Sequence, residues 1–231
     1  MSTSGAPTIS VGEATTRQRR KDARPQELLD AALELFVQKG YAATRTEEVA
    51  ARAGVSKGTL YRYYPSKEEL LEAVLRHRLS SQVELGVLET EAHAGSASEL
   101  LRDSVAPWWL RVVESPASGV IKLVVTEARS FPEIAECYRL EVVEPGRRLI
   151  ARILRRGIAA GEFRPLDVDA AVNSLLLPLM MLCVHRHSLG ACAPQAAVNA
   201  RSFIKQHVDL FVRGLRASAG DAVATPTADR L

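Results

Sequence analysis

The feature that most constrains the fold of this chain is residues 46–71, TEEVAARAGVSKGTLYRYYPSKEELL, where a tight turn separates two short helical patterns. The apolar residues of the first pattern repeat at helical spacing: Val49, Ala50 and Ala53. Gly54 follows where a helix commonly ends in a left-handed conformation that only glycine adopts at low cost. Ser56 can cap the second helix, because its hydroxyl can accept an amide of the first turn. The stretch therefore predicts a helix-turn-helix.

The second helix of this motif is expected to present polar and basic side chains to solvent. Leu60 and Tyr64 lie four residues apart and are predicted to anchor it to the rest of the unit. Arg62 can donate as a fork to guanine O6 and N7, and Thr59 can offer its hydroxyl or methyl to a base edge. Gly58 leaves room for a phosphate. An exposed helix of this kind predicts insertion into the major groove of DNA, although an ordinary helix-helix corner gives the same short pattern.

The sequence before the motif completes a unit of three helices. The segment ARPQELLDAALELFVQKG ends in Lys39-Gly40, and its apolar residues share one face: Leu28, Ala32, Leu35 and Phe36. Together with G-Y-x-A-T and the motif itself, residues 24–74 resemble the N-terminal domain of the TetR/AcrR family of transcriptional regulators.

The resemblance implies an all-α homodimer with an N-terminal three-helix helix-turn-helix DNA-binding domain and a C-terminal helical ligand-binding and dimerisation domain. It also implies repression and assigns DNA contact to nine residues: Arg45, Thr46, Lys57, Gly58, Thr59, Tyr61, Arg62, Tyr63 and Lys67. Two positions depart from the family pattern. Arg45 replaces the usual Ser or Thr, which leaves open whether Thr44 or Thr46 caps the helix. Tyr63-Tyr64 replaces the commoner His-Phe, so a phenol would contact the phosphate.

The distribution of charge agrees with a DNA contact in this region. Residues 17–67 contain eleven Lys or Arg and six Asp or Glu, a net charge of plus five, whereas the whole chain carries plus three. A basic arm precedes the first helix: Arg17, Arg19, Arg20, Lys21 and Arg24. It is either a solvated, disordered leader or a segment that follows the minor groove or the DNA backbone.

Strand signals are nearly absent, and helical periodicity predicts six further helices. They are expected at residues 66–92, 97–114, 118–130, 133–160, 167–188 and 195–216. The expected divisions are a disordered basic leader (1–22), the helix-turn-helix domain (23–69), a helical effector-binding and dimerisation domain (70–217) and a disordered tail (218–231).

The helix at residues 167–188 contains Leu175–Val184, a run that is apolar around the whole circumference and must be covered on every side. A partner subunit can cover it together with the helix at residues 195–216, which gives a four-helix bundle between subunits. The alternative is a helix central to the core of one monomer. Two reading heads about 34 to 36 Å apart would address successive major grooves, which predicts a near-palindromic operator.

A small-molecule site is expected between the helices of the C-terminal domain, where apolar walls with few polar groups bind ligands. The candidates are Trp108, Trp109, Phe131, Tyr138, Met180, Met181 and His185, each of which also suits a plain core. The expected effector is a small apolar or aromatic molecule that shifts the spacing of the reading heads through the helix at residues 66–92.

Other functions are disfavoured by the sequence. Cys183 and His187 lie four apart, but no further Cys-His group has metal-site spacing, so neither a metal nor a cofactor is predicted. The chain has no phosphate loop, nucleotide fingerprint or nucleophile elbow, which argues against an enzyme. A sequence-nonspecific architectural DNA-binding protein remains the alternative. Three cysteines, no secretory signal and no apolar run of about 18 residues predict a cytoplasmic protein.

Overall fold

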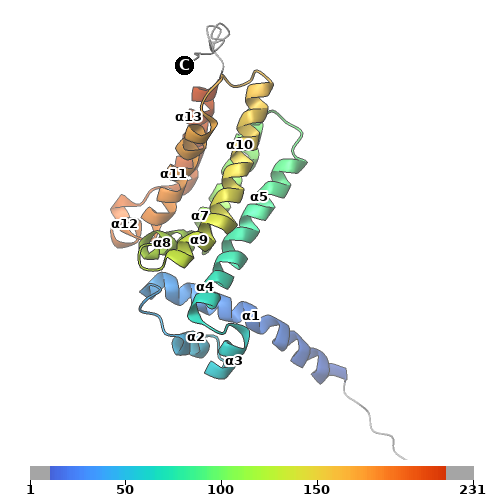
Figure 1. Ribbon diagram of the computed structural model, residues 1–231, viewed down its shortest axis with the longest axis vertical. Helices are drawn as coiled ribbons and strands as arrows, with labels where there is room; N and C mark the ends of the chain where they lie inside the picture. The colour runs from blue at the N-terminus through green and yellow to red at the C-terminus, as the bar shows by residue number, and fades with distance from the viewer. Residues whose placement is uncertain (1–10, 217–231) are drawn as a thin grey trace, which may run out of the picture. The chain divides into compact units, whose positions relative to one another are not determined.

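The computed structural model describes the backbone of residues 11–216 and the side chains of residues 25–90, 93–193 and 195–216 (Figure 1). The elements in this range are helices, with one isolated antiparallel bridge between Phe163 and Arg216 and no strand. The predicted all-α class is therefore confirmed. The chain divides into two compact units between Leu71 and Glu72, two residues beyond the domain boundary expected from the sequence.

The first unit consists of α1 (Val11–Lys39), α2 (Thr46–Arg52), α3 (Lys57–Tyr63) and the first turn of α4 (Lys67–Leu75). Its core contains the side chains predicted to share one face of α1, joined by residues of the other helices: Leu28, Ala32, Leu35, Phe36, Tyr41, Val49 and Leu60. Gly40 and Gly54 have positive φ values of 88° and 65°, as expected for the residues that end α1 and α2.

Helix α1 begins at Val11, well before the expected start at residue 23. The sequence predicts a disordered leader over residues 1–22, whereas the structure has helix at residues 11–22. Arginine, a good helix former, occurs three times in residues 11–22, beside single Ala, Glu, Gln and Lys residues that also favour helix, which is consistent with a helix that continues back past Pro25. Residues 1–10, the side chains of the basic arm and the tail expected at 218–231 lie outside the described residues.

The second unit is a bundle of helices (Figure 1). Some of these helices contain π-helical turns. In chain order its segments are α4 continued by η1 (Arg76–Ser80) and α5 (Ser81–Ala92); α6 (Ala97–Glu99), η2 (Leu100–Val105) and α7 (Ala106–Glu114); α8 (Ala117–Glu127); α9 (Pro132–Tyr138), η3 (Arg139–Val143) and α10 (Glu144–Ala159); α11 (Val168–Arg186); α12 (Leu189–Cys192); η4 (Pro194–Ala196); and α13 (Ala200–Leu215). Helix α13 starts later than expected because Asn199 caps it, its side chain accepting the amide of Ser202 at 2.9 Å.

The turn after α10 packs back onto the bundle. Gly161 has a φ of 70°, and the reversal brings Phe163 over Gly157, where Phe163 is buried. The carboxylate of Glu162 accepts the backbone amides of Ala97 and Ser98, both at 2.8 Å. This carboxylate therefore satisfies free amides at the start of the helix that begins with α6.

Helix α11 packs against α8, α10 and α13, but part of its apolar surface is uncovered. Leu177 is 59% exposed and Met181 is 61% exposed. By length and composition alone, the segment Val168–Cys192, with a mean hydropathy of 1.6, is long and apolar enough to cross a membrane. Core helices of soluble proteins share this length and composition. The sequence argument from the longest apolar run did not detect this segment, because Asn173 and Ser174 interrupt it.

Candidate nucleic-acid interface and effector cavity

The start of α2 differs from both alternatives left open by the sequence. Arg45 is the N-cap residue, and the carboxylate of Glu48 accepts its backbone amide at 3.2 Å. The buried hydroxyl of Thr44 instead donates to the carbonyl of Gly40 at 2.8 Å. Thr46 shares a 2.9 Å hydrogen bond with the hydroxyl of Tyr61, so neither threonine caps the helix.

Thr46 was expected to contact DNA directly, but the residue is only 7% exposed. Its hydrogen bond to Tyr61 joins α2 to α3. This position therefore orients a phenol on the neighbouring helix, and the expectation of direct contact does not fit its burial. This contact could not be predicted from the sequence, because the spacing of residues within α2 does not reveal which residue of α3 faces Thr46.

The turn between α2 and α3 has the predicted geometry. Ser56 accepts the amide of Thr59 at 3.1 Å and shares a 2.9 Å hydrogen bond with the Thr59 hydroxyl. A Cβ atom added to Gly58 would meet only the Ser56 hydroxyl, at 4.0 Å. The folded unit itself therefore does not require glycine at position 58, which is consistent with space reserved for a DNA backbone.

Helix α3 has one buried anchor and an exposed basic side. Leu60 is fully buried, whereas Tyr64 is half-buried, ends the helix and donates to the Pro25 carbonyl at 3.5 Å. Arg62 is exposed, with its guanidinium 5.3 Å from the centre of the Tyr63 ring. Lys57 is also exposed and pairs with Glu47, and this hydrogen bond raises the pKa of Lys57. The predicted outward face is thus accessible, with Tyr64 a weaker anchor than expected.

Lys67 is more constrained than expected for a residue that touches only the DNA backbone. Its ammonium lies 4.3 Å from the centre of the Tyr41 ring and donates to the Ala42 carbonyl at 3.3 Å. Nearby, the side chain of Ser66 accepts the amide of Glu69 at 3.0 Å at the start of α4. Lys67 therefore also fixes the loop between α1 and α2.

The nine predicted contact residues differ in accessibility. Five are exposed: Arg45, Lys57, Gly58, Tyr61 and Arg62. Three are half-buried: Thr59, Tyr63 and Lys67. Thr46 is buried. Apart from Thr46, the residues proposed to read or hold DNA can all be reached from solvent.

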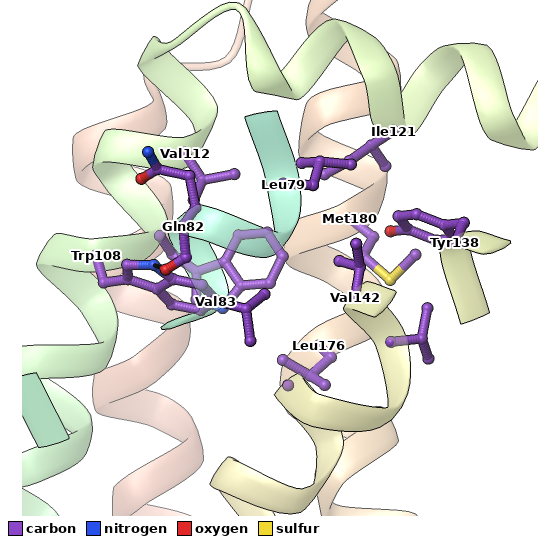
Figure 2. A pocket seen from close by; sticks show the side chains of 13 residues that line it. Leu79, Gln82, Val83, Trp108, Val112, Ile121, Tyr138, Val142, Leu176 and Met180 are labelled. Carbon is purple, nitrogen blue, oxygen red and sulfur yellow. Dashed lines mark hydrogen bonds between the residues drawn. The ribbon is translucent and has the colours of Figure 1, made fainter. Parts of the chain in front are cut away.

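The second unit contains an apolar cavity of about 50 Å³ (Figure 2). Its lining residues are Leu79, Gln82, Val83, Trp108, Trp109, Val112, Ile121, Tyr138, Val142, Val143, Gly146, Leu176 and Met180. Figure 2 shows Trp108 on the side of Gln82 and Val83, and Tyr138 on the opposite side beside Met180. Sites for drug-sized ligands measure roughly 300 to 1,000 Å³, so an effector must widen this cavity.

Only part of the expected ligand set lines this cavity. Trp108, Trp109, Tyr138 and Met180 do so. Met181 faces solvent, because successive helical residues point about 100° apart. Neither His185 nor Phe131 lines this cavity. His185 shares a 2.8 Å hydrogen bond with the Ala196 carbonyl, and Phe131 is the N-cap residue of α9.

Sequence reasoning missed the contribution of the long helix that begins with α4. Leu79, Gln82 and Val83 line the cavity and are spaced three and four residues apart, which is the spacing of one helical face. That pattern was present in the sequence but could not be told from ordinary core packing.

Cys183 and His187 have separate surroundings in the structure. Burial raises the pKa of the Cys183 thiol to about 12. His187 shares a 2.8 Å hydrogen bond with the Ser118 hydroxyl. Among the described residues no three side chains of metal-binding type come together.

His187 predicts a pH dependence of stability. Burial, and then the positive charges of Arg186 and Lys122, lower its pKa below the ordinary value of 6.5. A lowered histidine pKa gives stability that is complete above the unfolded value and declines as the pH falls below it. We expect the free energy of unfolding to fall as the pH drops through the ordinary histidine pKa of 6.5, and His187→Gln to reduce that fall. Urea titrations measure it, with the exposed His77→Gln as control; an unchanged slope in His187→Gln contradicts it.

The sequence matches two family models. Residues 28–74 match the bacterial regulatory proteins of the tetR family, and residues 92–200 match the tetracyclin repressor-like C-terminal domain. Together the two matches span both units.

Similar proteins include both a repressor and an activator of transcription. The HTH-type transcriptional repressor KstR2 of Mycolicibacterium smegmatis is 28% identical over 203 residues, covering 86% of this chain and 94% of that protein. The HTH-type transcriptional activator FasR of the same species is 34% identical over 115 residues, covering 50% and 52%. The crystal structure of the transcriptional regulator FadR from Bacillus subtilis in complex with stearoyl-CoA has a TM-score of 0.67 at 22% identity, covering 83% of this chain and 99% of that chain. The last similarity shows a shared fold.

Proposed function

Because this chain belongs to the TetR family of bacterial transcriptional regulators, we propose that it is a repressor that binds a near-palindromic operator as a homodimer and is released by an apolar or aromatic effector. The observation that carries the DNA-binding part is the exposed side of α3. Arg62, Tyr61 and Lys57 are accessible there, while Leu60 holds the helix from behind. We assign the reading domain to residues 23–69 and the effector and dimerisation domain to residues 70–217.

The uncovered apolar side chains of α11 and α13 support a dimer through these helices. Leu177 and Met181 on α11 are exposed, and Leu210 on α13 is 68% exposed. Large apolar side chains clustered at a surface mark sites that another protein covers. A second copy that presents the same two helices would bury them in a four-helix bundle.

The cavity supports control by a ligand. Leu79, Gln82 and Val83 belong to the continuous helical stretch that starts with α4 at Lys67, beside the reading helix in sequence. A ligand that widens the cavity must displace these side chains, and the displacement can pass along the helix. Release of DNA then requires that the ligand bind the DNA-incompetent state more tightly. The structure of FadR from Bacillus subtilis in complex with stearoyl-CoA supports this proposal, because that protein shares the fold.

We propose repression because the repressor KstR2 aligns with most of this chain, whereas the activator FasR aligns with only half of it. Homologous regulators are not enzymes, and we propose the same for this chain, acting in the cytoplasm where its DNA lies. The rival function is architectural, sequence-nonspecific DNA binding. The cavity in the second unit favours regulation, because a protein that only coats DNA has no use for it.

The test is selection of genomic DNA fragments by the full-length protein, followed by footprinting. We expect a protected site with approximate two-fold symmetry and half-sites about one helical turn apart. A steeply salt-dependent binding that is equal for all fragments would instead establish the architectural function.

Arg62 provides the sharpest test of base reading. Arg62→Ala is expected to weaken operator binding by roughly 1 to 3 kcal/mol and relax specificity at about one base position. Arg62→Lys keeps the charge but loses the two-pronged geometry, so it should retain the salt dependence and still lose discrimination. Fluorescence anisotropy with operator variants measures both. Arg52→Ala, an exposed arginine of α2 paired with Glu34, is the control. Equal losses on all operator variants would show that Arg62 contacts only the backbone.

A further inference from the structure

One tryptophan that lines the cavity of the second unit has a buried indole N–H that lacks an acceptor among the described residues. Trp109 is 6% exposed and lines the cavity, and its Nε1 atom is buried without a hydrogen-bond partner among the described residues. The adjacent Trp108 differs, because its Nε1 donates to the Gln82 carbonyl at 2.7 Å. Buried donors are almost always satisfied in folded proteins, so a missing acceptor at a cavity wall points to a bound group.

The remaining walls define what such a group can be. None of the thirteen lining residues carries a charge. Burying an unpaired ion in such surroundings costs far more than a hydrogen bond returns. The part of a ligand enclosed here must therefore be uncharged.

The shape and polarity of the cavity walls restrict the ligand further. The rings of Trp108 and Trp109 meet edge to face, with centres 5.2 Å apart, and offer flat apolar surface. Burial raises the pKa of the Tyr138 hydroxyl, which stays protonated at neutral pH and remains a neutral polar group on the opposite wall. The enclosed group is thus mainly apolar, with room for few hydrogen bonds.

We propose that the effector of this cavity is an uncharged, largely apolar molecule with a carbonyl oxygen that accepts the hydrogen bond of Trp109 Nε1. The inference rests on the proposed function, because it names the chemistry of the effector. The two adjacent tryptophans then have different roles: Trp109 recognises the ligand, and Trp108 is held by Gln82. An apolar molecule without an acceptor fills the same space but leaves the Trp109 donor unsatisfied.

The test compares ketones with hydrocarbons of nearly equal shape on the full-length protein. The pairs are acetophenone with ethylbenzene, benzophenone with diphenylmethane, and fluorenone with fluorene, measured by calorimetry. Both tryptophans of the chain line the cavity, so their fluorescence reports on it alone. We expect at least one ketone to bind roughly tenfold more tightly than its hydrocarbon. 4-Benzoylbenzoate, which carries a charge, is expected to bind more weakly than benzophenone.

Two matched variants identify the donor. Trp109→Phe should abolish the preference for the ketone, whereas Trp108→Phe should retain it. The proposal is overturned if no ketone binds, if each ketone and its hydrocarbon bind equally to the unmodified protein, or if the preference survives Trp109→Phe. The comparison on the unmodified protein stands even if a variant fails to fold. Retention of symmetric operator DNA is measured separately, so loss of the ketone preference alone leaves the proposed regulatory function intact.

Discussion

The double substitution Leu177→Glu and Met181→Glu is expected to convert the protein to monomers and to weaken operator binding by roughly 100-fold or more, because unpaired charges buried at an interface cost several kcal/mol. Both side chains are exposed on α11 in the subunit. A monomer presents one reading helix to one half-site and loses the second set of contacts. Sedimentation velocity and gel shift measure the two effects.

The matched control is Leu85→Glu with Leu88→Glu, which places two glutamates on exposed apolar positions of α5. These positions lie outside the proposed interface and should leave both the mass and the DNA affinity unchanged. If the α11 variant remains a dimer while the α5 variant dissociates, subunits associate through a different surface. If neither dissociates, α11 contributes little to association.

Gly157→Ala is expected to destabilise the second unit by roughly 1 to 3 kcal/mol, the usual cost of overfilling a packed core. A Cβ atom at this position would overlap ring carbons of the buried Phe163 and lie 2.9 Å from the Cβ atom of Ala97. The ring has little space to move, because it closes the turn after α10. Chemical denaturation of the full-length protein measures the loss.

Gly146→Ala is the control on the same helix, because an added Cβ atom there meets nothing within 4 Å. In an open helical position, alanine is more favourable than glycine by up to about 1 kcal/mol. Both substitutions replace glycine with alanine, but they should therefore change the free energy of unfolding in opposite directions. A stabilising Gly157→Ala would show that the turn carrying Phe163 rearranges freely.

The helices were largely predictable from sequence because their boundaries depend on local chemistry. Ser56 caps α3 and Gly54 ends α2 through contacts within a few residues. The start of α1 lies earlier than the sequence predicts, because residues that favour helix continue it through the basic arm before Pro25. The late start of α13 follows from Asn199, a capping residue that helical periodicity alone does not reveal.

The site was less predictable, because its residues depend on contacts distant in sequence. The role of Thr46 is set by Tyr61, fifteen residues away, and no spacing rule gives that pairing. Met180 and Met181 are adjacent and equally apolar, yet only Met180 lines the cavity. On a helix that is apolar all round, periodicity cannot tell which side faces inward.

The π-helical turns of the second unit have a mechanical consequence for the cavity. Leu79 lies in η1, and Val142 and Val143 lie in η3, so two of these turns form part of its wall. A π turn holds one more residue than an α turn, and converting one into the other slides the adjoining helix by about 1.5 Å and rotates it by about 100°. The two helices that form this wall can thus shift in discrete steps while they remain hydrogen-bonded. Such a shift costs less free energy than local unfolding when a molecule enters the cavity.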